Sequence, residues 1–193
     1  MTDLENLAQI DKTTALRAYF RESGLLLCNI NNDLPSLETV GGDWAGIISL
    51  IEQGEVFYSK VFKNRVSYLS AQLYFLLKPY KQRTCKLSAE SRRMFDFICA
   101  AELATSKEIK AALGLSSKTF TFCMDALFKE LFVTAVKRDK TLNANWSSFY
   151  WGTFEVWERR QPRPDVDGAA NVAGINDLLG GIMTEKQIKN LLS

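Results

Sequence analysis

The chain has 193 residues, with 24 Lys and Arg against 22 Asp and Glu, so its formal net charge is +2. This balance excludes a histone-like basic arm and a polybasic membrane anchor for the chain as a whole. With 47% hydrophobic and 24% charged residues, the composition is typical of a folded protein and excludes disorder throughout. The positive charge is concentrated in residues 78–93, which hold six cations and one anion.

The sequence contains no histidine. This excludes the usual general base near neutral pH and every Ser-His or Cys-His nucleophile pair, so catalysis would depend on carboxylates, amides or lysine. Cys28, Cys85, Cys99 and Cys123 never approach Cys-x-x-Cys spacing, and we expect them to be small core residues without a bound metal. No leader opens the chain, and no apolar run reaches the ~18–20 residues of a membrane span. We therefore expect a cytoplasmic protein with neither cofactor nor membrane partner.

The N-terminal part predicts two helices and a hairpin. A helix that begins at Thr13 or Thr14 and ends at Gly24 is followed by a loop over residues 29–42, which is rich in turn-forming Asn, Asp, Pro and Gly. Residues 43–54 fit a helix with an aspartate N-cap. The apolar period then changes to two, which predicts a hairpin over residues 55–69 with a polar turn.

Four further helices are predicted after the hairpin. The first begins near Ser70, and Pro79 is expected to limit its regular part, because proline lacks the amide hydrogen that a helix interior needs. The other three lie within residues 88–131, each opened by a Ser or Thr N-cap. The turn Leu113-Gly114-Leu115 between the last two is the tight corner of a helix-turn-helix.

A two-stranded wing follows these helices. It consists of a strand at 132–137, a polar turn at 138–145 and an aromatic strand at 146–157. Helix, helix, turn, helix and wing is the order of a winged helix, and it is clearest at residues 86–158.

The C-terminal end is predicted to be a linker followed by a helical tail. Residues 161–172 contain prolines, a glycine and alternating charges, which is typical of an exposed linker. The tail, residues 173–193, carries an apolar stripe and a capping box of Thr184 and Gln187, and it favours two short helices. Its stripe, within 175–192, could dock on a protein partner or mediate self-association.

The predicted winged helix points to double-stranded DNA, because such a domain inserts its third helix into the major groove and rests its wing on the backbone. The candidate DNA-binding residues lie in the basic segment, on the third helix and at the wing tip: Lys78, Lys81, Arg83, Lys86, Arg92, Arg93, Ser117, Lys118, Thr121, Lys137, Arg138 and Lys140. Asp125, Glu130 and Asp139 lie on or near the same surfaces and would oppose docking. The alternative is that these faces are merely solvated and that the domain is a protein-interaction module.

The cluster Asn29 to Asp33 allows two interpretations. Its amides and carboxylate could line a pocket that holds a base, or its residues could form a turn through their own side-chain hydrogen bonds, which is the interpretation we favour. Aromatic residues could likewise stack on bases, but their strand and helix spacing favours the core.

Several scattered segments resemble the AlkZ-related proteins, which are bacterial relatives of the winged-helix DNA glycosylases that excise alkylated or crosslinked bases. The resemblance covers about residues 20–158 and rests on aromatic and small residues. These segments are Gly42-Asp43-Trp44, Val56-Phe57-Tyr58-Ser59-Lys60-Val61-Phe62, Tyr68-Leu69-Ser70, the helix-turn-helix from Ser106, Leu131-Phe132-Val133-Thr134, Trp146-Ser147-Ser148 and Trp157.

The order of the predicted elements indicates a mainly α fold with short β-hairpins (α+β), and the resemblance implies that it is built of tandem winged-helix-like units. The active glycosylases use a Gln-x-Gln or Gln-x-Asp pair, and the only match here is Gln9-Ile10-Asp11, which lies close to the start of the chain. We therefore expect no catalytic residue and DNA binding without base excision, in DNA repair or transcription regulation. The alternative is an N-glycosidic DNA glycosylase.

The implied domains are an N-terminal unit with a degenerate winged-helix-like fold at residues 1–80 and a winged-helix domain at 81–160. The linker and the tail follow them.

Overall fold

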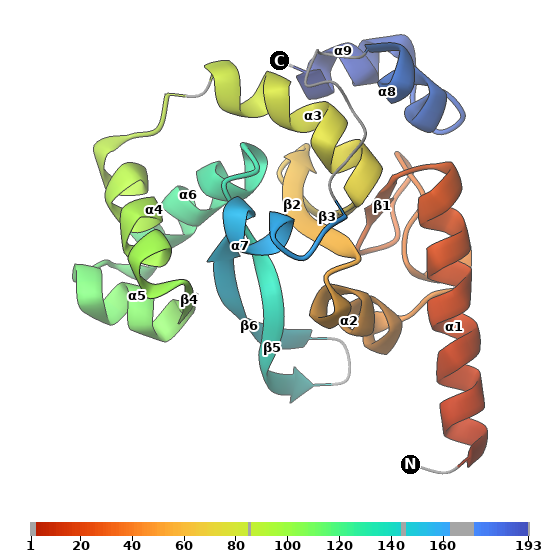
Figure 1. Cartoon of the computed structure of the whole chain (residues 1–193), viewed down its shortest axis with the longest axis horizontal. Coiled ribbons are helices and arrows are strands. Elements are labelled where there is room, and N and C mark those ends of the chain that lie inside the picture. Colours follow the sequence, from red (N-terminus) through yellow and green to blue (C-terminus); the bar gives the residue numbers. More distant parts are fainter. Residues whose placement is uncertain (1–2, 85, 144–145, 163–171, 193) are drawn as a thin grey trace.

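A computed structural model of the chain describes residues 3–84, 86–143, 146–162 and 172–192, without the side chains of residues 3–11, 84 and 146. The first part of the chain, which we call the first unit, places two helices beside a small antiparallel sheet (Figure 1). Its elements are α1 (Asp3–Glu22), β1 (Leu25–Leu27), the 3-10 turn η1 (Glu38–Val40), α2 (Trp44–Gln53), β2 (Val56–Phe62) and β3 (Arg65–Ser70).

The second unit repeats this order. Its elements are α4 (Ala89–Ala101), β4 (Leu103–Thr105), α5 (Ser106–Leu113), α6 (Ser117–Lys129), β5 (Val133–Asn143), β6 (Trp146–Thr153) and α7 (Phe154–Glu158). The strands of the first sheet lie in the order β1-β3-β2 and those of the second in the order β4-β6-β5. In both units, therefore, a strand that follows the first helix pairs with the last strand of the hairpin. The helix α3 (Ala71–Thr84) joins the units, and α8 (Val172–Leu179) and α9 (Glu185–Leu192) form the tail.

The predicted fold class, mainly α with short β-hairpins, is confirmed. Local capping chemistry fixes several helix starts where the sequence predicts them. The Asp43 carboxylate accepts the Gly46 N–H at 2.7 Å, and the Thr105 hydroxyl accepts the Glu108 N–H at 3.3 Å. The Thr184 hydroxyl accepts the Gln187 N–H in the same way. These side chains satisfy backbone donors that the first turn of a helix leaves free.

Two helix predictions are wrong in their bounds. The first helix begins at Asp3, about ten residues before the predicted start. Thr13 and Thr14 lie inside α1, so neither residue is its N-cap. Pro79 does not end the regular part of α3, which continues to Thr84. Leu76 and Leu77 just before the proline are buried in the core, and this packing compensates for the hydrogen bond that proline removes.

The wing also differs from its prediction. The strand β5 runs to Asn143, so the residues from Arg138 onward that were predicted as a turn pair with β6. The strand β6 ends at Thr153, and α7 replaces the rest of the predicted aromatic strand. The short strand β4 was not predicted at all. It pairs with β6 far along the chain, which no local periodicity reveals.

The two units share a hydrophobic core. Tyr58 of the first unit lies 5.1 Å from Phe128 and 5.5 Å from Trp151 of the second, measured between ring centroids. The Tyr58–Phe128 contact is edge-on and the Tyr58–Trp151 contact is tilted, and aromatic contacts of this kind bury large apolar areas. The predicted domain boundary at residues 80 and 81 falls inside α3.

A buried seam joins the sheets where the edge strand β2 lies against β5. The backbone N–H of Tyr58 donates to the Thr134 hydroxyl at 2.8 Å, and the Trp157 indole N–H donates to the Val56 carbonyl at 3.1 Å. Both backbone groups point away from β3, at the outer edge of β2, where the first sheet ends. Side chains of the second unit therefore satisfy the open edge of the first.

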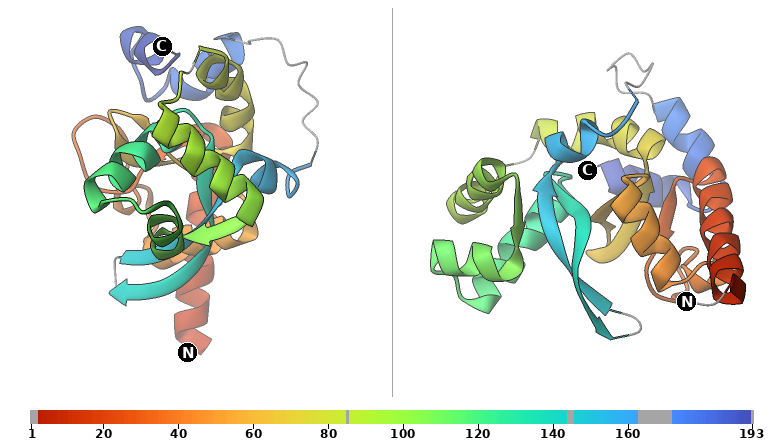
Figure 2. Two further views of the ribbon diagram at one scale, coloured as in Figure 1. Left: turned by 90° about the vertical axis from the view of Figure 1, so that its left-hand side faces the viewer. Right: turned by 60° about the horizontal axis from the view of Figure 1, so that its bottom comes forward.

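The tail packs on α3, away from α6 (Figure 2). Ile175, Leu179 and Leu191 are buried in one cluster with Leu73 and Leu77 of α3. The two short helices predicted for the tail are confirmed, and much of the apolar stripe is used inside the chain. Of the predicted linker, residues 163–171 lie outside the described part of the chain.

We predict that Thr134→Val destabilises the protein by about 1–3 kcal/mol, because the buried Tyr58 N–H loses its acceptor while the side-chain shape is kept. Chemical denaturation followed by tryptophan fluorescence measures the change. Thr141→Val, on the exposed part of the same strand, is the matched control and should change the free energy of unfolding by less than about 0.5 kcal/mol. Equal stability of Thr134→Val and the parent protein would contradict the role given to the seam.

Candidate nucleic-acid interface

The helix α6 is fixed by its cap and by one apolar face. The Ser116 hydroxyl accepts the Thr119 N–H at 3.1 Å, and Cys123, Met124, Leu127 and Phe128 are buried. The opposite side of the N-terminal half is open to solvent. Its exposed residues are Ser117, Lys118, Thr121 and Phe122. Three of these were predicted from the sequence, and Phe122 was not.

The basic segment divides into two parts. Lys81 is only 2% exposed, and the Lys78 ammonium lies 2.6 Å from the Glu158 carboxylate and 4.3 Å from the centre of the Phe154 ring. These two lysines are occupied inside the fold. The remaining cations of this segment are exposed and have no ion-pair partner among the described residues. They are Arg83, Lys86, Arg92 and Arg93.

The predicted wing cations are all exposed, but they differ in their contacts. The Arg138 guanidinium lies 3.7 Å from Glu52 of α2, and the Lys137 ammonium lies 4.5 Å from the centre of the Tyr150 ring. Lys140 has no ion-pair partner in the described part of the chain. Asp139 accepts a hydrogen bond from the Ser148 hydroxyl at 2.9 Å.

The structure does not bring all predicted residues into one patch. The outer ends of the wing strands β5 and β6 and the start of α4 lie at opposite ends of the second unit in all three views (Figures 1 and 2). A single straight duplex contact therefore favours one set. The N-terminal half of α6 brings together three predicted candidates, Ser117, Lys118 and Thr121, on its exposed side.

The carboxylates on or next to α6 are paired, and the first unit supplies the partner of Asp125. The Asp125 carboxylate lies 2.6 Å from the Lys60 ammonium and accepts a hydrogen bond from the Asn64 amide at 3.1 Å. Glu130 lies 3.8 Å from Lys129. Asp125 therefore repels phosphates less than an unpaired carboxylate would, because its charge is already paired with Lys60 within the fold.

The β2–β3 turn adds polar groups that the sequence-based prediction missed. Lys63 and Asn64 both have positive φ, 48° and 55°, which suits a two-residue hairpin turn. Lys60, Lys63 and Arg65 were predicted only as strand and turn residues. This hairpin is the first unit's counterpart of the wing. The repeat of the element order was therefore the signal in the sequence that could have marked these three cations as candidates.

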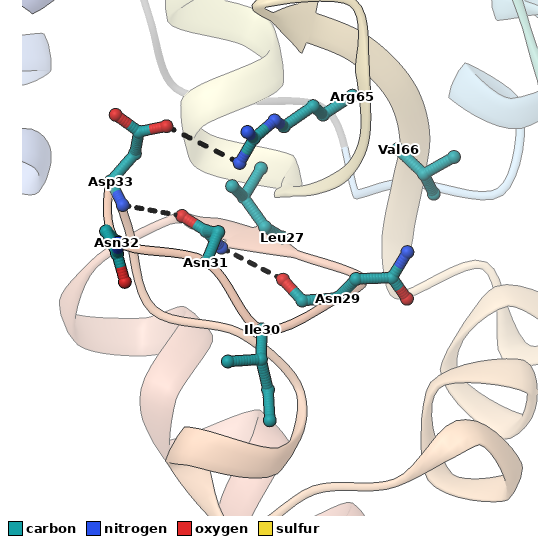
Figure 3. Close-up of a pocket in the computed structure, with 8 residues that line it drawn as sticks. All are labelled: Leu27, Asn29, Ile30, Asn31, Asn32, Asp33, Arg65 and Val66. Carbon is teal, nitrogen blue, oxygen red and sulfur yellow. Dashed lines mark hydrogen bonds and ion pairs between the residues drawn. The ribbon is translucent and has the colours of Figure 1, made fainter.

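The loop at 29–33 forms both a turn and a pocket. The Asn31 amide oxygen accepts the N–H groups of Asp33 and Leu34 at 2.7 and 2.9 Å, and its amide nitrogen donates to the Asn29 carbonyl at 2.9 Å (Figure 3). These bonds are those of the turn interpretation. The same loop lines one side of an open pocket of about 660 Å³, together with Arg65.

Two cations hold the Asp33 carboxylate. The Lys63 ammonium lies 2.5 Å from one oxygen. The Arg65 guanidinium reaches the other oxygen at 3.4 Å, as Figure 3 shows. The Lys63 hydrogen bond and the charges of both cations lower the pKa of Asp33 from its usual value. Asp33 is therefore a carboxylate at neutral pH and is not a proton donor.

The AlkZ-related family model matches residues 33–191, which is most of the chain. The chain belongs to the AlkZ-related family. No curated protein and no solved structure matches it. The family match extends over α8 and α9, beyond the predicted limit near residue 158. Residues on which the resemblance rests lie at the seam of this AlkZ-related protein, among them Tyr58, Thr134 and Trp157.

The Gln9-Ile10-Asp11 match lies before the family span, in a part of α1 whose side chains the structure does not describe. In the part of the AlkZ-related chain that is described, there is no group of His, Cys, Asp or Glu residues that could hold a metal ion. No helix among the described residues has the length and hydrophobicity of a membrane span.

We predict that Lys63→Gln raises the pKa of Asp33 toward its usual value, because the strongest hydrogen-bond donor to the carboxylate loses its charge. In the parent protein, the lowered pKa stabilises the fold at pH values above the unfolded pKa of Asp33, and this stabilisation is lost as the pH falls through the folded pKa. NMR titration of the Asp33 carboxyl carbon measures the shift. Lys186→Gln on α9 is the control, and an unchanged Asp33 titration in Lys63→Gln would contradict the pairing.

Proposed function

We propose that this AlkZ-related protein binds double-stranded DNA through tandem winged-helix-like units, with the N-terminal half of α6 directed into the major groove. The shared element order and sheet order of the two units support this proposal. Family membership supports a DNA-repair-related fold. A role in repair or in transcription regulation remains part of the proposal.

One observation carries the proposal. The exposed face of α6 presents Ser117, Lys118 and Thr121, while Asp125 on the same helix is already paired with Lys60. The Ser117 hydroxyl and the Lys118 ammonium can donate to phosphates and base edges, whereas the Thr121 hydroxyl donates to the Ser117 carbonyl at 3.0 Å and offers an acceptor. No uncompensated carboxylate interrupts this stretch of the helix. The helix therefore offers donors to an anionic partner.

Further phosphate contacts are assigned to one of two sets of exposed cations, because a single straight duplex favours one of them. The first set is Lys137, Arg138 and Lys140 of the wing, and the second begins with Arg92 and Arg93 at the start of α4. Arg83 and Lys86 extend the second set toward α3. Lys78 and Lys81 are left out of this interface, because they are engaged within the fold.

Base excision is the alternative. Incubation with alkylated DNA followed by alkaline treatment tests it, and intact strands after this treatment would contradict it.

We predict that a labelled duplex binds the protein and that its affinity falls about tenfold or more between about 50 and 200 mM salt, because several phosphates release their counterions. Fluorescence anisotropy measures the affinity at each salt concentration. No binding at the lower salt concentration would contradict the proposal.

We further predict that Lys118→Glu weakens duplex binding about tenfold or more, since a phosphate donor becomes a repelling charge. Lys186→Glu makes the same charge change on α9, on the side of the tail, and should leave affinity within about twofold of the parent protein. Both residues are exposed, so thermal unfolding should be unchanged in both variants. An equal effect of the two substitutions would indicate net charge rather than a site on α6.

A further inference from the structure

Phe122 is the feature of α6 that a duplex-binding face does not explain. Its side chain is 67% exposed, although a phenylalanine on a helix normally lies in the core. It lies one turn after Lys118 and one turn before Asp125, so the three side chains share one face of the helix. An aromatic ring is thus held in solvent between a lysine and an ion-paired aspartate.

The β2–β3 turn of the first unit lies directly beside this face. Lys60 and Asn64 both contact the Asp125 carboxylate, at 2.6 and 3.1 Å. The face that carries Phe122 is therefore continuous with a hairpin turn rather than ending at the edge of α6.

The surface then continues from the turn to the loop pocket. Lys63 and Arg65, on either side of Asn64, both contact Asp33, which lines the pocket. Figure 3 shows Asn29 and Asn32 on opposite sides of this loop, and neither amide has a hydrogen-bond partner among the described residues. Arg65 is half exposed, and Ile30 adds an apolar side chain that is 65% exposed.

This path has the composition of a surface for unpaired nucleotides. Four cations, Lys118, Lys60, Lys63 and Arg65, face two carboxylates along it, so it carries an excess of positive charge. A base has a π-face that stacks on an aromatic ring whatever its identity, and flanking cations hold the phosphates. Amides and an arginine in a pocket offer hydrogen bonds to base edges that are no longer paired.

We propose that the surface from Phe122 across the β2–β3 turn to the 29–33 pocket, which we call the strand path, binds a single-stranded DNA segment that adjoins a duplex. This inference rests on the proposed function, because the start of α6 would hold the duplex. The substrate class is then DNA with a junction between paired and unpaired strands. Phe122 stacks the first unpaired base, and the turn cations bind the phosphates that follow.

The test compares a blunt duplex of about 15 base pairs with the same duplex carrying an overhang of about 6 nucleotides. Fluorescence anisotropy at about 50 mM salt should show that the overhang substrate binds about tenfold more tightly. Phe122→Ala should remove this preference and leave blunt-duplex affinity unchanged, whereas Phe122→Tyr should retain the preference. Val172→Ala, which shortens an exposed apolar side chain on α8, is the matched control and should change neither affinity.

A second readout tests stacking directly. A fluorescent adenine analogue at the first overhang position should be quenched on binding by the parent protein, and this quenching should be lost in Phe122→Ala. Arg65→Glu should weaken binding of the long overhang but not of one of about 2 nucleotides, because only the longer strand reaches the pocket.

The outcomes separate the two proposals. If the protein bound neither the blunt duplex nor the overhang substrate, the duplex proposal and the strand path would both be overturned. Tight binding of the blunt duplex with no gain from the overhang would overturn only the strand path. Equal loss of both affinities in Phe122→Ala would make Phe122 part of duplex binding and would likewise overturn its stacking role.

Discussion

The satisfied edge of β2 is the constraint on which the rest of the structure depends. An edge strand presents backbone donors and acceptors that must find partners when they are buried, and here Thr134 and Trp157 supply them from the other unit. Because these bonds run between side chain and backbone, they fix one relative placement of the sheets without merging them. The aromatic cluster around Tyr58 then fills the space behind them. The position of α6 beside the first hairpin follows from this placement.

The same placement makes the candidate interface a property of both units. Asp125 belongs to α6, but its charge partner Lys60 belongs to β2. A helix with an unpaired carboxylate would repel a phosphate backbone, and the first unit removes that repulsion. The first unit therefore acts on α6 electrostatically as well as through packing. Loosening the seam would disturb both the orientation of α6 and the pairing of its Asp125 charge, even though no residue of the seam lies on the exposed face of α6.

Sequence reasoning succeeded where structure is determined locally. Asp43 and Thr105 cap helices because a side-chain oxygen three residues from a free N–H is a local matter, and the pattern shows it. Sequence reasoning failed where residues far apart in the chain determine the structure. Lys81 counts as a cation in any charge tally, yet the fold buries it. Lys60 meets Asp125 across 65 residues of chain, and the three residues of β4 become a strand only by pairing with β6. The exposed face of α6 could therefore be predicted from the sequence, but the pairing of Lys60 with Asp125 beside it could not.

The docking of the tail on α3 has a consequence for how the protein is made. The helix α3 leaves the ribosome long before α8 and α9, whose Ile175, Leu179 and Leu191 cover its apolar side chains. During synthesis, Leu73 and Leu77 therefore lack part of their final cover until α8 and α9 emerge. A product that ends early, before Val172, would keep this apolar surface open to chaperones and to other unfinished chains. The docking of α8 and α9 is thus the step that closes this apolar surface of α3.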